Sequence, residues 1–173
     1  DEDNFTLGIE STDSLTWKQR LDLDACINCG RCEEVCPPYI AEVEFSPKDF
    51  IQNSRELLYK REKAKAAADS ETRRGGVDGT GAADAGAKAP DAGGTRAASP
   101  TEGKIVGEAF DENFIWQCRM CMACEEVCPA FIDHVDTMVE VRRNEVVMQG
   151  RLPAEAAAAM KMLENQGNPF GPQ

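Results

Sequence analysis

The cysteines of this 173-residue chain occupy two twelve-residue stretches, which together hold all eight of them. Residues 26–37 read CINCGRCEEVCP and residues 118–129 read CRMCMACEEVCP, with eight identities in twelve positions. Each stretch separates its cysteines by three, three and four residues and places a proline directly after the last. This spacing of thiols, repeated in one chain, is typical of proteins that bind a pair of iron-sulfur clusters.

The spacing also predicts how the thiols are shared between two clusters. Three cysteines with two-residue gaps can wrap one cubane cluster, whereas the fourth is carried away by a helical turn and ligates the other cluster. We therefore predict two 4Fe-4S clusters with crossed ligands. The first is held by Cys26, Cys29, Cys32 and Cys128, and the second by Cys118, Cys121, Cys124 and Cys36. Pro37 and Pro129, which lack a backbone donor, are expected to end the helical turns between the last two cysteines of each stretch.

Zinc and disulfides are the competing uses of such thiols. Zinc favours two Cys-x-x-Cys pairs and has no use for a regularly placed third cysteine followed by a fourth and a proline. Disulfides would close very small loops, and the N-terminus has no secretory signal that would indicate an oxidising compartment. A Rieske centre requires two histidine ligands, and His134 is the only histidine. Iron-sulfur clusters are therefore the favoured interpretation.

Other side chains near the motifs could act on the clusters without binding them. As a lone histidine near a helix start, His134 is expected at the surface or behind the ligands rather than as a catalytic base. Arg31 and Arg119 lie within the ligand loops, where they either raise the reduction potential or are simply exposed. The acidic pairs 33–34 and 125–126 are interpreted as solvated faces of helical turns. The expected apolar shell consists of Ile27, Val35, Met120, Met122, Val127, Phe131 and Ile132.

The segments that must position these loops are predicted to be helices. Residues 46–63 open with a serine N-cap and a proline at the first helical position, and apolar residues follow on one side. Residues 111–118 form a short helix that leads into the second motif. Residues 133–150 repeat apolar residues at three- and four-residue steps, and residues 153–167 form a last helix between a proline and a glycine. Strand signals are almost absent, although residues 42–45 could be extended, so the predicted fold class is mostly α.

Composition divides the chain into three parts. Residues 64–103 hold twelve Ala, eight Gly and a single apolar side chain larger than Ala, so they are predicted to be a flexible insertion. Residues 1–63 and 104–173 then form the two halves of one domain, each with one cysteine motif. The net charge of -12 argues against a nucleic-acid partner. No apolar run reaches the roughly 18 residues of a membrane span. Because it lacks an initiating Met and stops in a turn-like stretch, we expect the chain to be a segment of a longer polypeptide.

Two tracts resemble a known family beyond the general cysteine pattern. Residues 15–37 with 45–51, and residues 105–148 with 163–171, are similar to the iron-sulfur part of heterodisulfide-reductase-related, membrane-associated oxidoreductases. The resemblance covers nearly all of the chain outside the predicted insertion. It implies an alpha-helical ferredoxin domain, as found in the iron-sulfur subunits of succinate dehydrogenase and fumarate reductase. It also implies that the eight cysteines already named are the cluster ligands.

The same resemblance implies a function. In this family the domain relays electrons between a membrane-bound cytochrome b or quinone site and a catalytic domain rich in Cys-Cys-Gly motifs, in the cytoplasm at the inner face of the cell membrane. This chain has no adjacent Cys-Cys pair. We therefore expect an electron-transfer module with redox proteins as partners, not an enzyme by itself. The alternative is the iron-sulfur subunit of a succinate, fumarate, glycolate or glycerol-phosphate oxidoreductase.

Overall fold

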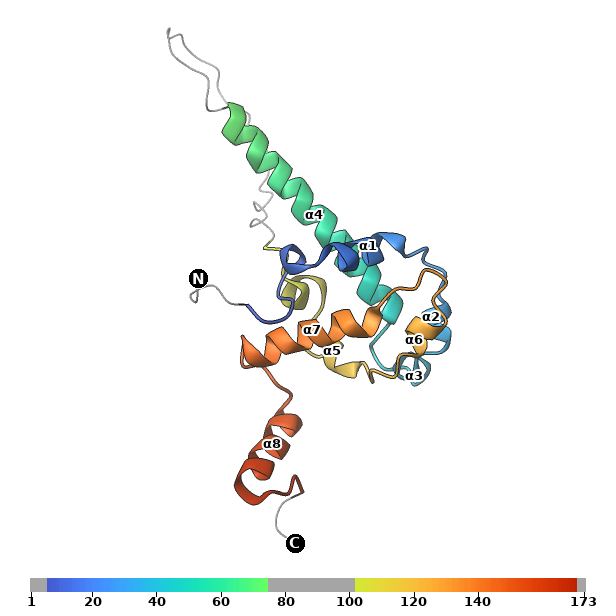
Figure 1. Ribbon diagram of the computed structural model, residues 1–173, viewed down its shortest axis with the longest axis vertical. Helices are drawn as coiled ribbons and strands as arrows, with labels where there is room; N and C mark the ends of the chain where they lie inside the picture. The colour runs from blue at the N-terminus through green and yellow to red at the C-terminus, as the bar shows by residue number, and fades with distance from the viewer. Residues whose placement is uncertain (1–5, 75–101, 171–173) are drawn as a thin grey trace, which may run out of the picture.

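The computed structural model of the chain describes residues 6–74 and 102–170, and most of these residues are helical (Figure 1). In chain order the elements are η2 (Thr12–Ser14), α1 (Trp17–Ala25), α2 (Arg31–Glu34), α3 (Pro37–Ile40), α4 (Pro47–Arg74), η3 (Ile105–Ala109), α5 (Phe114–Gln117), α6 (Ala123–Glu126), α7 (His134–Val147) and α8 (Ala154–Gln166). No named strand occurs in these two ranges. The mostly α fold class is therefore confirmed.

The four segments predicted to be helical form α4, α5, α7 and α8. Residues 42–45, for which an extended conformation was considered, instead form a turn. Glu42 has a φ of 56°, and the N–H of Phe45 donates to the carbonyl oxygen of Val43 at 2.6 Å. The N–H of Val43 donates in turn to the carbonyl oxygen of Pro38 at 3.0 Å. These local bonds follow the end of α3 and precede the start of α4, and residues 42–45 form no strand.

The helix α4 is longer than the sequence suggested, because it continues to Arg74. Residues 64–74 were assigned to the flexible insertion, and within the described residues that assignment is wrong. An Ala-rich stretch needs no apolar bulk to be helical, since Ala has the highest intrinsic helix propensity. Lys65 also ties this extension to the body by an ion pair with Asp13 at 2.5 Å. Residues 75–101 lie outside the described residues, and the three-part division of the chain stays a prediction.

The N-terminal segment links the two halves of the chain. The N–H of Ile9 donates to the carbonyl oxygen of Glu140 on α7 at 3.0 Å, and the side-chain amide of Asn144 donates to the carbonyl oxygen of Leu7 at 2.9 Å. Further along, the N–H of Thr12 donates to the carbonyl oxygen of Gly103 at 2.8 Å. The segment before α1 therefore lies between α7 and the chain that enters η3.

One hydrophobic core serves both halves. Its fully buried side chains come from α1, α4, η3, α5 and α7 and from the segments between them. The largest of them are Leu23, Phe50, Ile51, Ile105, Ile115, Ile132, Met138 and Val141. Because each half supplies only part of this core, neither half buries its apolar face alone.

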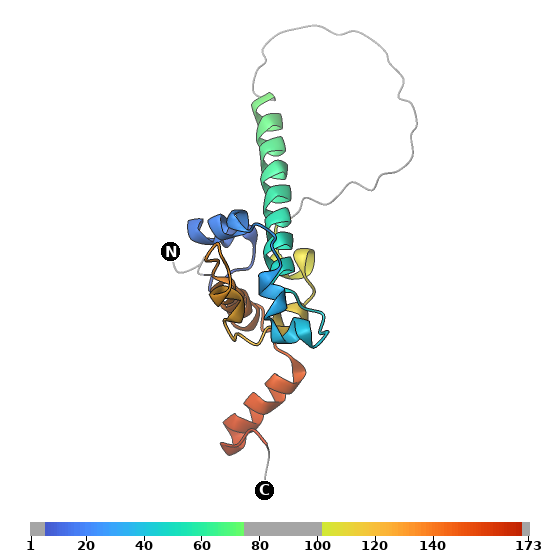
Figure 2. The ribbon, with the colours of Figure 1, turned by 90° about the vertical axis from the view of Figure 1, so that its right-hand side faces the viewer.

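The last helix, α8, projects from the body, as both ribbon views show (Figures 1 and 2). None of its residues is buried. The extended α4 projects at the opposite end of the molecule. Across the described residues, no helix combines the length and the apolar character that crossing a bilayer would require.

Candidate metal centre

Two hollows lie between the cysteine loops, and each is lined by four thiols. The first hollow is lined by Cys26, Cys29, Cys32 and Cys128, and the second hollow by Cys36, Cys118, Cys121 and Cys124. Each therefore combines three cysteines of one motif with the last cysteine of the other. This is the grouping that the spacing predicts, while ligation of clusters by these thiols stays a prediction.

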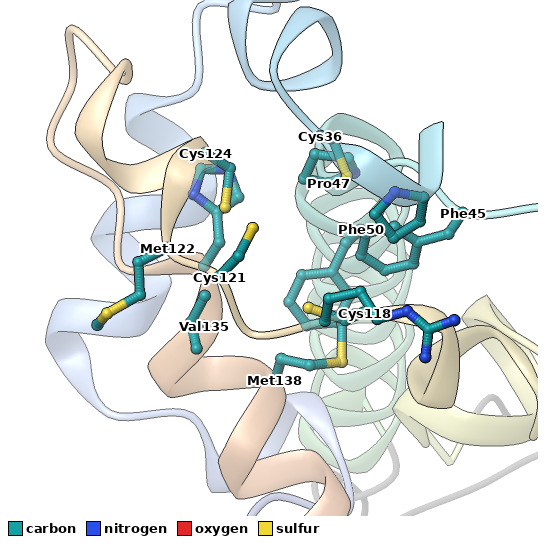
Figure 3. A pocket seen from close by; sticks show the side chains of 13 residues that line it. Cys36, Phe45, Pro47, Phe50, Cys118, Cys121, Met122, Cys124, Val135 and Met138 are labelled. Atoms are coloured by element: carbon teal, nitrogen blue, oxygen red, sulfur yellow. The ribbon is translucent and has the colours of Figure 1, made fainter. Parts of the chain in front are cut away.

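The thiols surround a space rather than a point. The empty space is about 340 Å³ in the first hollow and about 400 Å³ in the second, part of it open to solvent. Figure 3 shows the second hollow: Cys36 approaches from one side, Cys121 and Cys124 from the other, and Phe45 and Phe50 close it beside Cys36. In residues 6–74 and 102–170, no three His, Cys, Asp or Glu side chains are gathered tightly enough to hold a single metal ion.

The two ligand loops have the same backbone path. Between the first and third cysteines, Asn28 and Gly30 of the first loop have φ values of 57° and 81°, and Met120 and Met122 of the second loop have values of 52° and 62°. These left-handed residues turn the chain so that three thiols face one side. Asn and Gly tolerate this conformation well, whereas Met does not. The third cysteine of each loop then lies in a one-turn helix, α2 or α6.

The long helix that follows each motif supports the loop in a matching way. Arg55 is the ninth residue of α4 and Arg142 the ninth residue of α7. Arg55 donates to the carbonyl oxygen of Cys26 at 3.4 Å, and Arg142 donates to that of Cys118 at 2.7 Å. Each arginine thus holds the backbone of the first cysteine of its motif. The two halves are structural repeats that extend beyond the cysteines.

The acidic pairs behave differently from their interpretation as solvated faces. Glu33 is only 8% exposed, accepts a hydrogen bond from Ser46 Oγ at 2.7 Å and pairs with Lys48 at 2.7 Å. Glu125 is half-buried and accepts from the N–H of Val135 at 2.6 Å. For these two residues the interpretation was wrong, because each carboxylate stabilises the start of the helix after its motif. Their neighbours at 34 and 126 are exposed, as interpreted.

Burial disfavours the charged form of several thiols. Burial first, and the neighbouring Glu33 and Glu125 carboxylates second, together raise the pKa of Cys32 to about 11 and that of Cys124 to about 12. Burial also raises the pKa values of Cys36 and Cys118. Cluster binding requires thiolates, so insertion of a cluster would release protons from these cysteines. Bonds to iron would then stabilise the negative thiolates, which burial alone disfavours.

His134 is buried, at 5% exposure, and it lines both hollows. Its Nδ1 lies 3.0 Å from the carbonyl oxygen of Ile132. His134 was expected either at the surface or behind the cysteines, and its burial shows that it does not lie at the surface. Burial lowers the pKa of His134, which favours a neutral ring.

Arg31 and Arg119 are exposed and also line the first and second hollows, while an effect on the reduction potential stays a prediction. The expected apolar shell is only partly formed. Ile132 is buried and lines the first hollow, whereas Phe131 is 82% exposed and does not line either hollow. The side chain of Phe131 points out because its φ of 54° turns the backbone just after Pro129.

Sequence reasoning missed the polar residues of α4 that contact the first motif. Gln52 donates from Nε2 to the sulfur of Cys26 at 3.0 Å, and Arg55 donates to the side-chain oxygen of Gln52. A signal was present, because Arg55 and Arg142 fall at the same helical position. The segment between motif and helix differs in length between the two halves, however. The sequence alone therefore does not show that Arg55 and Arg142 occupy matching positions.

These observations define the class of protein. The family described as 4Fe-4S dicluster domain matches residues 22–132, which span both motifs and both hollows. The chain belongs to this family and is an iron-sulfur electron-transfer domain of oxidoreductases. Four sulfur donors around each hollow fit the thiolate ligation that a 4Fe-4S cluster requires.

Particular relatives of the chain are longer proteins that contain a similar stretch. The chain is 35% identical, over 98% of its length, to the EtfAB:quinone oxidoreductase of Syntrophomonas wolfei. It is 34% identical, over 99% of its length, to the "Probable membrane-anchored ferredoxin" of Chromohalobacter salexigens. It is 28% identical, over 92% of its length, to one subunit of the dihydromethanophenazine:CoB–CoM heterodisulfide reductase of Methanosarcina barkeri. The chain spans 23%, 23% and 32% of these relatives, and no solved structure matches it.

Proposed function

We propose that this domain binds one 4Fe-4S cluster in each hollow and relays electrons one at a time through the pair. Cys26, Cys29, Cys32 and Cys128 hold the first cluster, and Cys118, Cys121, Cys124 and Cys36 hold the second. The observation that carries this proposal is the exchange of the last cysteine between the motifs, so that each hollow receives a fourth thiol from the other half of the chain.

The place of the relay in a larger protein is proposed from the relatives. One relative is named for EtfAB and a quinone, another for dihydromethanophenazine and a heterodisulfide, and a third as membrane-anchored. We propose that the domain passes electrons between a membrane cytochrome b or quinone site and a catalytic Cys-rich domain, at the cytoplasmic face of the membrane. The clusters held by this chain carry the electron, and substrate chemistry takes place elsewhere in the complex.

Single Cys→Ser variants of the anaerobically purified full-length protein test the ligand sets without prior assignment of the EPR signals. Cys36→Ser and Cys121→Ser should perturb one signal, and Cys128→Ser and Cys29→Ser the other, because each pair is taken from one cluster. If Cys36→Ser and Cys29→Ser perturb the same signal, the crossed scheme is wrong. A wild-type protein that binds zinc, or far fewer than about eight irons, would overturn the two-cluster proposal.

A further inference from the structure

The first hollow has a side-chain hydrogen bond to a ligand sulfur. Gln52, half-buried on α4, donates from its amide Nε2 to Cys26 Sγ at 3.0 Å. Nitrogen-to-sulfur bonds of this kind are among the features that set the reduction potential of an iron-sulfur cluster. The bond therefore bears on the redox properties of this hollow.

The orientation of the amide is fixed by Arg55, one turn further along α4. An amide has a donor end and an acceptor end, so it could face the sulfur with either. The guanidinium of Arg55 donates to Gln52 Oε1, which turns the amide nitrogen toward Cys26. Arg55 also donates to the carbonyl oxygen of Cys26 at 3.4 Å. One arginine thus positions both the donor amide and the cysteine that receives it.

The second hollow has the arginine but not the amide. Arg142 matches Arg55 at the ninth position of its helix. At the sixth position, where α4 has Gln52, α7 has Val139, which has no side-chain donor. The sulfur of Cys118 accepts instead from the backbone N–H of Met120 in its own loop, at the longer distance of 3.4 Å. The repeats therefore differ in whether a side chain donates to the sulfur of the first cysteine.

We infer that Gln52, oriented by Arg55, raises the reduction potential of the cluster in the first hollow relative to that of the cluster in the second. An N–H dipole aimed at a ligand sulfur stabilises the additional negative charge of the reduced state. Partial burial strengthens this effect, because water screens it less. Each hollow has an arginine at the carbonyl oxygen of its first cysteine, so the feature that distinguishes the first hollow is the side-chain amide of Gln52. Gln52 is a positioning and tuning residue and not a ligand.

The inference rests on the proposed function and deepens it, because it ranks the two stations of the relay. The first cluster is the one on which a single electron comes to rest at equilibrium.

EPR-monitored redox titration of the full-length protein, purified anaerobically, tests the inference. Gln52→Val places in the first half the residue that the second half has. It should lower the reduced-to-oxidised ratio of the first cluster about tenfold at a fixed potential, which is about 59 mV for a one-electron couple. Gln52→Glu keeps the size and the contact with Arg55 but presents only acceptor oxygens, so it should lower the ratio further. The second cluster should move little in either variant.

Asn53→Val is the matched control, because it removes the exposed amide next to Gln52 on the same helix. Its potentials should equal those of the wild type. Side-chain 15N-labelled glutamine provides a second measurement: electron-nuclear double resonance should detect a nitrogen coupling in the first cluster that Gln52→Val removes.

The inference is overturned if both clusters are present and the first potential stays unchanged in Gln52→Val and Gln52→Glu, or if both clusters shift equally. If Gln52→Val loses the first cluster, the potential of the first cluster in the isosteric Gln52→Glu variant decides whether the inference holds. A protein with no pair of reversible clusters would instead contradict the proposed function, and the Cys→Ser variants identify that case separately.

Discussion

Glu33 and Glu125 stand at the same place in the two motifs, directly after the third cysteine, and each accepts a hydrogen bond from the start of the helix that follows its motif. For Glu33 the donors are Ser46 Oγ and Lys48 Nζ, both at 2.7 Å, and for Glu125 the donor is the N–H of Val135 at 2.6 Å. Each carboxylate therefore joins the one-turn helix that bears the third cysteine of its motif to a long helix of the core. A negative group at this end of a helix is also favoured by the helix dipole.

Replacing Glu33 should destabilise the protein far more than replacing its neighbour. Glu33→Ala leaves Ser46 and the half-buried Lys48 without their acceptor, which we expect to cost about 2–3 kcal/mol. Glu34→Ala is the control, because Glu34 is exposed and surface substitutions usually stay within about 0.5 kcal/mol. Thermal unfolding of the two cluster-bearing variants measures the difference. Equal melting temperatures would show that the carboxylate does not hold α4 to the motif.

The role of these glutamates also shows where sequence reasoning stops. The two residues of each acidic pair are identical in type, and a charged residue next to another is ordinarily solvated. Successive residues of a helix point in different directions, and here Glu33 faces Ser46 and Lys48 at the start of α4 while Glu34 stays exposed. Which residue of the pair faces α4 depends on packing against a segment that comes 13 or more residues later in the sequence, and no local pattern encodes that packing.

The helices themselves were predictable because their apolar residues repeat with a helical period. Phe50, Ile51, Leu57 and Leu58 are all buried, as an amphipathic helix requires. The end of α4 was not predictable from the same signal, because residues 64–74 are helical without an apolar face. On α7, Arg142 falls among the apolar repeats but satisfies the carbonyl oxygens of Ile115 and Cys118. Its long side chain packs against Trp116, with the guanidinium 5.3 Å from the ring centroid.

Gly8 should tolerate no side chain. Its φ is +75°, and an added Cβ would lie 2.2 Å from the carbonyl oxygen of Glu140 and 2.7 Å from the N–H nitrogen of Asn144. Gly8→Ala should therefore push the N-terminal segment off α7 and destabilise the protein by about 2–3 kcal/mol. Gly150→Ala has a similar φ of +64° but open space around it, so it should cost about 1 kcal/mol from backbone strain alone. Equal losses in melting temperature would rule out the steric explanation for Gly8.

Asp13 should stabilise the second half of α4, through Arg61 and Lys65, to the same extent throughout the neutral pH range. Its hydrogen bond with Lys65, and a weaker one with Arg61, hold the pKa of this carboxyl below its usual value. A carboxyl with a depressed pKa contributes stability above its unfolded pKa, near 4, and loses it only as pH falls through the folded value.

Asp13→Asn should therefore lower the stability by at most about 1 kcal/mol, since the group is partly exposed and screened. The loss should be equal at about pH 6 and pH 8 and smaller at about 1 M salt, as measured by thermal unfolding. A loss that differs between those pH values, or that salt leaves unchanged, would contradict the ion-pair explanation.

Met120 should be a site where a polar residue stabilises the second ligand loop. It has a φ of 52° and is 47% exposed, so it bears backbone strain without much compensating burial. The matching residue of the first loop is Asn28, at a φ of 57°, and Asn accepts this conformation more readily than Met. Met120→Asn should raise the stability of the cluster-bearing protein by up to about 1 kcal/mol and slow the loss of its second cluster.

The same substitution in a helix should act in the opposite direction, which separates backbone strain from any general effect of replacing an exposed methionine. Met160 lies on α8 and is 62% exposed. Met160→Asn should cost about 0.5 kcal/mol, because Asn is the poorer helix former. Melting temperatures of the two variants give the comparison directly. If both fall together, the left-handed residues of the second loop are not under strain, and the difference in residue type between the two loops has no energetic consequence.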